Sequence, residues 1–120
     1  MSPRRALIVD DSFDAAESLA FVLRRAGYEV RLAHDGVEAV RAAQSFAPEV
    51  VLLDLGLPKL NGYEVARRIR EQGGQAVRLV AITGWGKAED RRASKEAGFD
   101  YHLMKPVDIG LLQRLLDADD

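Results

Sequence analysis

Residues 50–54 read Val-Val-Leu-Leu-Asp, four apolar residues followed by one acid. A run this short and this apolar is typical of a strand that is covered on both faces, as at the centre of a parallel sheet. The next residues, 55–58, read Leu-Gly-Leu-Pro and do not continue as a helix, so Asp54 is predicted to end the strand. Because open α/β sheets form their sites at the carboxyl ends of the strands, Asp54 is a candidate site residue.

Three more apolar runs lead into a polar side chain. Asp10-Asp11 follows residues 6–9, Thr83 follows residues 79–82, and Lys105 follows Leu103-Met104. If all four runs are parallel strands, their ends meet along one edge of a sheet. That edge would hold three acids, one hydroxyl and one cation, a set that suits Mg²⁺ and a phosphoryl group.

Helical patterns alternate with these runs. An edge strand with one wet face is expected over residues 28–32, where apolar residues alternate with Glu29 and Arg31. The other predicted elements are a helix ending at Gly27, a helix opening at Asp35, a helix between Pro58 and Gly73-Gly74, a helix over about residues 87–97, a strand over residues 101–104 and a last helix from about Val107. Five strands alternating with five helices predict an α/β fold whose parallel sheet is covered on both faces.

Composition limits the possible functions. The 120 residues suffice for one domain with a single core, expected over about residues 5–116. The formal net charge of −2 gives no broad positive field for direct nucleic-acid binding. The arginine clusters are expected on solvated helix faces; they are Arg24-Arg25, Arg67-Arg68 with Arg70, and Arg91-Arg92. The absence of cysteine excludes thiolate metal sites, and without a long apolar stretch we expect no membrane insertion and a cytoplasmic location.

Taken together, these residues resemble the receiver domain of bacterial two-component response regulators, over about residues 5–116. The resemblance rests on Asp10-Asp11, Asp54 with Pro58 four residues on, Thr83-Gly84 and Lys105-Pro106, each at the end of its own strand. Residues 54–58, 83–86 and 97–106 look most like receivers associated with hybrid histidine kinases. The resemblance implies the flavodoxin-like, doubly wound (βα)5 fold with strand order 2-1-3-4-5.

The chemistry of this set follows from its charges. Three carboxylates held together repel one another and raise each other's proton affinity, so a cation among them is favoured, and Mg²⁺ fits best. The resemblance implies that its ligands are Asp10, Asp11, Asp54 and the backbone carbonyl of Gly56. Asp54 would then be the nucleophile that takes a phosphoryl group, with Lys105 and Thr83 stabilising the charge that spreads over the phosphoryl oxygens.

The resemblance also implies partners. A histidine kinase or a histidine phosphotransfer protein would donate the phosphoryl group, and a downstream protein would bind the face formed by the fourth helix, fifth strand and fifth helix. The chain would modify its own Asp54 without turning over an external substrate, so we do not expect an enzyme in the usual sense.

Further predictions concern residues around the predicted site. Gly56 lacks the side chain that many receivers place beside the attacking water, so the phosphoryl lifetime is expected to differ. Trp85 either covers the site or packs beside its loop, and the Lys105-Pro106 bond is implied to be cis. His102 stands where receivers often carry Tyr or Phe that moves with Thr83, which makes it either a charge-dependent switch or an exposed interface residue. His34 and Tyr63 are interpreted as structural.

Simpler interpretations compete with each residue taken alone. Asp10, Asp11 and Ser12 could merely cap a helix, and Asp54 could merely shape a turn. A phosphatase with an Asp nucleophile would usually carry a second acid where this chain has Gly56, and no Gly-x-Gly-x-x-Gly follows a strand to bind a nucleotide. The main alternative function is a pseudo-receiver, an interaction module that keeps the fold but does not depend on phosphate.

Overall fold

The computed structural model describes residues 4–56, 61–72, 76–84, 92 and 95–117. Within them the elements run β1 (Arg4–Val9), α1 (Phe13–Arg25), β2 (Tyr28–Ala33), α2 (Gly36–Phe46), β3 (Val50–Asp54), α3 (Gly62–Glu71), β4 (Arg78–Thr83), β5 (Tyr101–Met104) and α5 (Ile109–Asp117). Most of the helix predicted over residues 87–97 lies outside the described residues. The last helix begins two residues later than predicted, because Asp108 accepts a hydrogen bond from the amide of Leu111 and so caps it.

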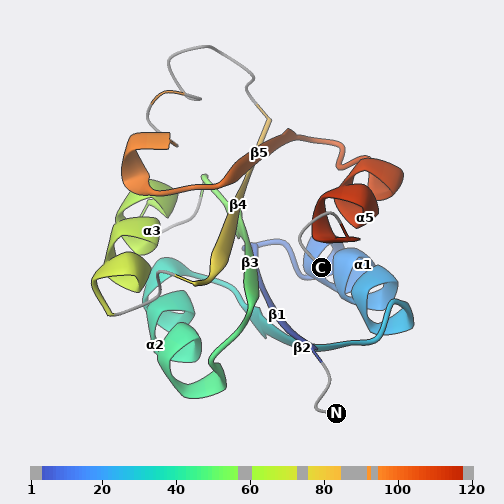
Figure 1. The fold of residues 1–120 in the computed structure, drawn as a ribbon, viewed down its shortest axis with the longest axis horizontal. Helices are drawn as coiled ribbons and strands as arrows, with labels where there is room; N and C mark the ends of the chain where they lie inside the picture. The colour runs from blue at the N-terminus through green and yellow to red at the C-terminus, as the bar shows by residue number, and fades with distance from the viewer. Residues whose placement is uncertain (1–3, 57–60, 73–75, 85–91, 93–94, 118–120) are drawn as a thin grey trace.

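The five strands form one parallel sheet in the order β2-β1-β3-β4-β5. Figure 1 shows α2 and α3 against one face of this sheet and α1 and α5 against the other. The predicted fold class and strand order are therefore confirmed. β2 lies at the edge, and its alternating burial matches the predicted wet face.

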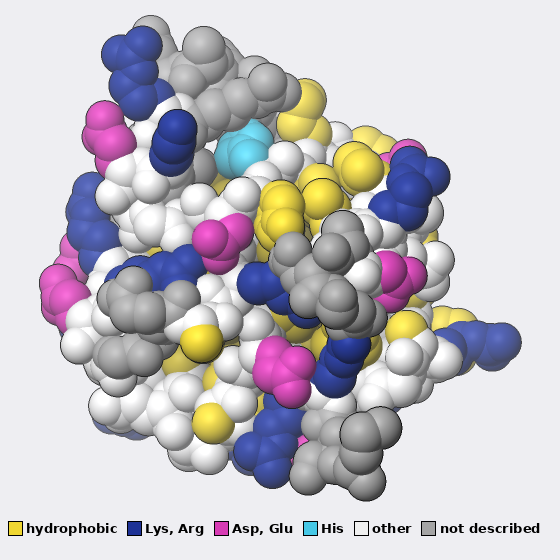
Figure 2. All heavy atoms as spheres, in the orientation of Figure 1, with side chains coloured by type: hydrophobic (Ala, Val, Ile, Leu, Met, Phe, Trp, Pro, Cys, Tyr) yellow, Lys and Arg dark blue, Asp and Glu magenta, His cyan; other side chains and the backbone are white. Residues whose placement is uncertain are grey.

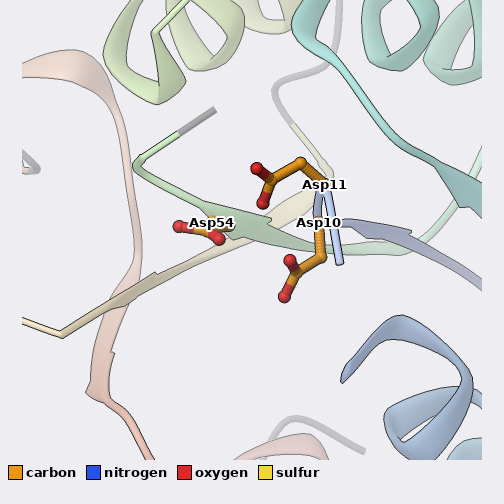
Figure 3. A group of neighbouring side chains, drawn as sticks. All are labelled: Asp10, Asp11 and Asp54. Carbon is orange, nitrogen blue, oxygen red and sulfur yellow. The ribbon is translucent and has the colours of Figure 1, made fainter. Parts of the chain in front are cut away.

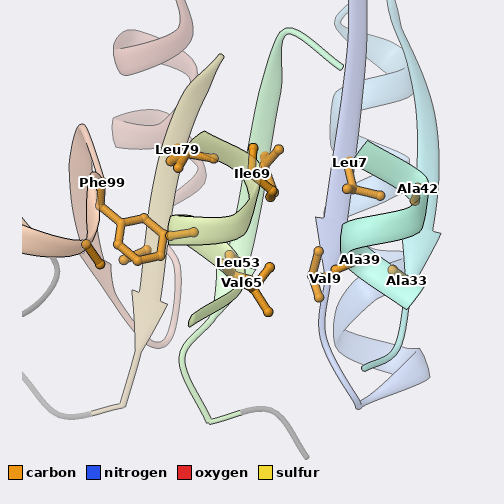
Figure 4. Close-up of a cluster of buried hydrophobic side chains, with 14 residues drawn as sticks. Leu7, Val9, Ala33, Ala39, Ala42, Leu53, Val65, Ile69, Leu79 and Phe99 are labelled. Carbon is orange, nitrogen blue, oxygen red and sulfur yellow. The ribbon is translucent and has the colours of Figure 1, made fainter. Parts of the chain in front are cut away.

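Two apolar cores of different composition lie on the two faces, and β3 serves both. Val51 and Leu53 join the core under α2 and α3, which Figure 4 shows, while Val50 and Leu52 join the core under α1 and α5. All four of these β3 side chains are 0% exposed. This double burial is the reason that the run 50–53 has no polar residue, since each face of a central parallel strand is covered by helices.

One of the arginines predicted on solvated faces is in fact largely buried. The Arg70 side chain is 16% exposed and lies between α3 and the segments that precede β4 and β5. Its guanidinium donates to the carbonyl of Val77 at 2.6 Å and to that of Gly98 at 2.7 Å, and it pairs with Asp100 at 2.9 Å. The prediction for Arg70 was wrong because two of its partners, Gly98 and Asp100, are 28 and 30 residues away and meet it only in the fold.

The described surface carries charges of both signs. Figure 2 shows Lys and Arg side chains interspersed with Asp and Glu, and hydrophobic side chains that gather where β5 leads into α5. Exposed apolar residues of this region include Met104 and Leu111. Among the described helices, none has the length and apolar character needed to cross a membrane.

Candidate functional site

Three carboxylates meet at the carboxyl edge of the sheet. β1 and β3 are neighbours with Val9 paired to Leu53, so the residues that follow, Asp10 and Asp54, lie side by side. Oxygens of Asp10, Asp11 and Asp54 lie within 4.8 Å of one another. In Figure 3 the three side chains border one common space beyond the strand ends. The register of two adjacent strands thus produces the predicted acidic cluster.

Asp10 is the most buried of the three acids, with 4% exposure. Its Oδ1 accepts a hydrogen bond from the amide of Ser12 at 2.9 Å. Burial raises the pKa of the Asp10 carboxyl, and the charges of Asp54 and Asp11 raise it further, while the Ser12 hydrogen bond and Lys105 act in the opposite direction. The net upward shift means that the ionised Asp10 lacks sufficient compensation from the protein alone.

Helix capping does not account for these acids. Ser12 is the N-cap of α1, and its hydroxyl accepts from the amide of Ala15 at 3.2 Å. Asp10 and Asp11 precede the cap, so their carboxylates are not needed for it. The capping interpretation is therefore correct for Ser12 and wrong for Asp10 and Asp11.

Asp54 ends β3 and is 8% exposed. One carboxylate oxygen, Oδ1, accepts from the amide of Gly56 at 2.8 Å, which is the hydrogen bond of an Asp that shapes a turn. The other oxygen, Oδ2, accepts from Nζ of Lys105 at 3.0 Å. The turn and the site are thus compatible, because the turn fixes the carboxylate in the orientation that faces Lys105.

Lys105 supplies a positive charge to the cluster. Its Nζ lies 3.0 Å from Asp54 Oδ2 and 3.9 Å from Asp10 Oδ2, and the side chain is 41% exposed. Partial burial acts to lower the pKa of Lys105, but the hydrogen bond and charge of Asp54, with Asp10 and Asp11 behind it, outweigh this and raise it. Lys105 therefore stays an ammonium ion throughout the neutral range. The bond from Lys105 to Pro106 is cis, as the resemblance implied.

Thr83 lies beside this group at the end of β4. Asp54 pairs with Ile82 in the sheet, so the buried Thr83 stands one residue beyond Asp54 on the neighbouring strand. Its carbonyl accepts from the amide of Lys105 at 2.8 Å. Backbone pairing of β4 with the end of β5 thus brings the hydroxyl and the ammonium to the same edge.

His102 pairs with Ala81, two residues before Thr83, and lies on the α2–α3 face of the sheet. Tyr101 packs against the opposite core, as strand alternation predicted. His102 is half-buried, which contradicts the alternative that it is an exposed interface residue. A role for His102 in switching stays a prediction.

The donor set fits a hard divalent cation. The part of the cluster that the structure describes brings three carboxylates together with one ammonium, so negative charge is in excess. Mg²⁺ prefers carboxylate and carbonyl oxygens and keeps several waters, which suits a cluster that includes the exposed Asp11. Gly56 is positioned by its hydrogen bond to Asp54, but the role of its carbonyl stays a prediction. Trp85 lies outside the described residues.

The strand order places this chain in the class of flavodoxin-like domains. The three acids, the threonine and the lysine at the carboxyl edge show that it is one with an acidic site. The sequence profile of the response regulator receiver domain matches residues 6–117. The chain belongs to this family and is a receiver domain of two-component signalling.

Individual relatives agree with the assignment. The response regulator MprA of Mycobacterium avium is 39% identical over 124 residues, which cover 97% of this chain and 54% of MprA. The chain thus spans about half the length of the curated MprA relatives that it matches.

Two solved structures are informative about the site. The receiver domain of the sensor histidine kinase PA1611 from Pseudomonas aeruginosa, with a magnesium ion in its active-site cleft, has a TM-score of 0.88 and 34% identity, covering 98% of this chain and 97% of that one. The receiver domain of Ssk1 from Saccharomyces cerevisiae, in complex with the histidine phosphotransfer protein Ypd1, has a TM-score of 0.87 and 29% identity, covering 96% and 88%. Similarity thus extends to response regulators and to a kinase-associated receiver alike, and a link to hybrid kinases stays a prediction.

Proposed function

We propose that Asp54 is the phosphoacceptor of this receiver domain. The observation that carries the proposal is the environment of its carboxylate: one oxygen fixed by the Gly56 amide at 2.8 Å and the other bonded to Lys105 Nζ at 3.0 Å. A carboxylate held in this way presents a lone pair in a defined direction without the freedom to rotate, which favours nucleophilic attack.

In the proposed reaction, a carboxylate oxygen of Asp54 forms a bond to phosphorus while the P–N bond of a donor phosphohistidine breaks. The electron pair of that bond returns to the ring nitrogen of the donor. Two side chains would donate hydrogen bonds to the phosphoryl oxygens as negative charge spreads over them. One is Lys105, which is hydrogen-bonded to Asp54 before the reaction, and the other is Thr83 at the end of the neighbouring strand β4.

Asp10, Asp11 and Asp54, with the Gly56 carbonyl, would hold Mg²⁺. The ion supplies neutralisation of the charge shared by the carboxylates and the phosphoryl oxygens. Support comes from the 4.8 Å cluster of carboxylate oxygens and from the upward pKa shift of Asp10, whose first cause is burial.

The donor is proposed to be a histidine kinase or a histidine phosphotransfer protein, by analogy with the complex of Ypd1 and Ssk1. The output is proposed to be a protein that binds the face made by the fourth helix, β5 and α5, where Met104 and Leu111 expose apolar surface. The chain would act on its own Asp54 without turnover of an external substrate. In this scheme the phosphoryl group biases two conformations of that face.

The test is intact mass after incubation with acetyl phosphate, with and without Mg²⁺. Wild type is expected to gain one phosphoryl group only with Mg²⁺, and Asp54→Asn is expected to gain none. Asp14→Asn, which changes an exposed acid on α1, is the matched control and should behave as wild type. A folded wild type without an adduct would overturn the proposal in favour of the pseudo-receiver, whose partner binding should not change in Asp54→Asn.

A further inference from the structure

His34 makes two contacts with the segment that carries Asp10 and Asp11. The residue follows the last residue of β2, and its Nδ1 lies 3.0 Å from the carbonyl oxygen of Asp10. Its ring also packs on the ring of Phe13, with centroids 3.9 Å apart and planes at 36°. Neither contact could be predicted from local patterns, because both partners are more than twenty residues away from His34.

The first contact adds a second interaction between the Asp10 backbone and the residues at the end of β2. The amide of Asp10 donates to the carbonyl of Ala33 at 3.0 Å, and the carbonyl of Asp10 contacts His34. A carbonyl oxygen can only accept a hydrogen bond, so a hydrogen bond at this contact requires the proton of the His34 ring to be on Nδ1. Both peptide groups that flank the Asp10 side chain are thereby held in place, which leaves the carboxylate with few directions in which to point.

His34 is itself anchored, so it can serve as a rigid support. The next residue, Asp35, is the N-cap of α2, and its Oδ1 accepts from the amide of Glu38 at 2.8 Å. The Glu38 carboxylate in turn accepts from the amide of His34 over a longer 3.4 Å. Together these two hydrogen bonds tie the backbone of His34 and Asp35 to the first turn of α2.

The second contact explains an exposed aromatic residue. Phe13 opens α1 and is 65% exposed, so the apolar core does not account for it. Its stack with His34 fixes the first turn of α1 relative to β2. Residues 10 and 13 are thus both held by one side chain, and the exposed ligand Asp11 lies between them.

We propose that His34 is a positioning residue of the metal site: its Nδ1–H donates to the Asp10 carbonyl and orients the Asp10-Asp11 segment for Mg²⁺. The proposal deepens the proposed function and rests on it for the identity of the ion. In many metal sites, residues that are hydrogen-bonded to the metal ligands orient those ligands, and their loss typically lowers the affinity for the metal by about 10- to 100-fold. Here the contact is to the backbone of a ligand, so we expect a smaller effect, about 3- to 10-fold.

Three variants separate the hydrogen bond from the stack. His34→Phe keeps an aromatic ring and removes the donor, whereas His34→Asn places an amide nitrogen near the former Nδ1 and removes the ring. Phe13→Leu removes only the stack. Mg²⁺ affinity is measured by calorimetric titration, and thermal unfolding of each variant checks that the domain is folded.

The expected result is a dissociation constant raised about 3- to 10-fold in His34→Phe and within about twofold of wild type in His34→Asn. A long-range ¹⁵N–¹H spectrum should show the His34 proton on Nδ1; the chain has two histidines, so His102→Gln assigns the signals. Equal affinity of wild type and His34→Phe, or a neutral ring with its proton on Nε2, would overturn the proposal.

A second measurement separates this proposal from the proposed function. If wild type binds no Mg²⁺, the metal part of the proposed function fails, and the positioning role is decided by hydrogen exchange. The Ser12 amide, which donates to Asp10 Oδ1, should then exchange faster in His34→Phe than in wild type and recover in His34→Asn. Unchanged exchange would overturn the role of His34 independently of any metal.

Discussion

At the amino edge of the sheet arginines donate to backbone carbonyls, whereas at the carboxyl edge aspartates face one another. The arginine contacts are Arg5 to Phe46 at 2.9 Å, Arg70 to Gly98 at 2.7 Å and Arg78 to Leu116 at 3.0 Å. Phe46 and Leu116 lie at or near the ends of α2 and α5, where helix carbonyls have no partner within the helix. At the other edge, Asp10 and Asp54 share the ammonium of Lys105, and Asp11 lies beside these two carboxylates.

The difference follows from the direction of the helices. In a parallel α/β fold the helices run opposite to the strands, so their carboxyl ends, which favour cations, gather at the amino edge. The arginines there donate hydrogen bonds to fixed backbone carbonyls, and these hydrogen bonds stabilise the fold. The carboxyl edge concentrates like charges that the protein compensates only in part, so this edge is prepared for a ligand at a cost in stability.

We expect the greatest loss of stability when an arginine at the amino edge is removed. Arg70→Ala should lower the free energy of unfolding by about 2–3 kcal/mol, because it removes the guanidinium that donates to the part-buried carbonyls of Val77 and Gly98. The Asp100 carboxylate loses the same partner and keeps its hydrogen bond from the Leu79 amide. Urea unfolding measures the change. The matched control is Arg68→Ala, an exposed arginine of the same helix paired only with Glu64 among the described ion pairs. Equal losses in the two variants would contradict the role assigned to Arg70.

The opposite sign is expected at the carboxyl edge. Asp10→Asn should raise the free energy of unfolding by about 1 kcal/mol at neutral pH without Mg²⁺, since it removes a buried charge and keeps an acceptor for Ser12. The folded-state pKa of Asp10 is raised, so wild-type stability rises as pH falls through that pKa, and the advantage of the variant should shrink there.

Added Mg²⁺ sharpens the same comparison. If the ion binds the folded state as proposed, it should stabilise wild type, and it should stabilise Asp10→Asn less because that variant has lost one carboxylate of the cluster. Thermal unfolding with and without the ion follows both effects. An Asp10→Asn variant that is less stable than wild type at neutral pH in the absence of Mg²⁺ would show that the carboxylates are already compensated.

A smaller effect is expected from Gly56. A Cβ at this position would meet Asp54 Oδ1 at 3.5 Å, which is ordinary contact, so a side chain fits without disturbing the turn. Gly56→Asn adds an amide that can hold water near the phosphoryl group, and it should shorten the phosphoryl lifetime about threefold. Gly56→Ala is the control without a polar group. Decay of phosphorylated protein, followed by intact mass, should be alike for Gly56→Ala and wild type.

The smallest expected effect concerns Trp85. If its ring covers the site, Trp85→Ala should admit water and shorten the phosphoryl lifetime about twofold. Trp85→Phe, which keeps an aromatic ring, should stay close to wild type in the same decay measurement. An unchanged lifetime in Trp85→Ala would favour the interpretation of Trp85 as a packing residue.

Much of this molecule could be predicted from local signals. The apolar runs located the strands, and Gly27 marked the end of α1, where its φ of 98° is the left-handed conformation that favours glycine. Asp10-Asp11, Asp54 and Lys105 were found because they lie at the ends of three different strands, and parallel pairing necessarily gathers strand ends. The roles of residues whose partners are close in sequence or fixed by strand order could therefore be predicted.

The errors share one cause. Arg70 was assigned to a solvated face, although it holds the start of β4 and of β5 together, and the alternative that His102 is an exposed interface residue is contradicted because the residue is half-buried. His34 was given no role toward Asp10. Charge, size and periodicity describe a side chain alone, whereas these three properties depend on what the fold places opposite it.

The sequence by itself determined the strand order through its family resemblance, the apolar interior, and the acids and lysine at the carboxyl edge. Only the tertiary structure decided how these groups are held: Asp54 between Gly56 and Lys105, and Asp10 between Ala33 and His34. The difference comes from separation along the sequence. Burial patterns and strand ends can be recognised from neighbouring residues, but the 3.0 Å contact between residues 10 and 34 exists only once the chain has folded.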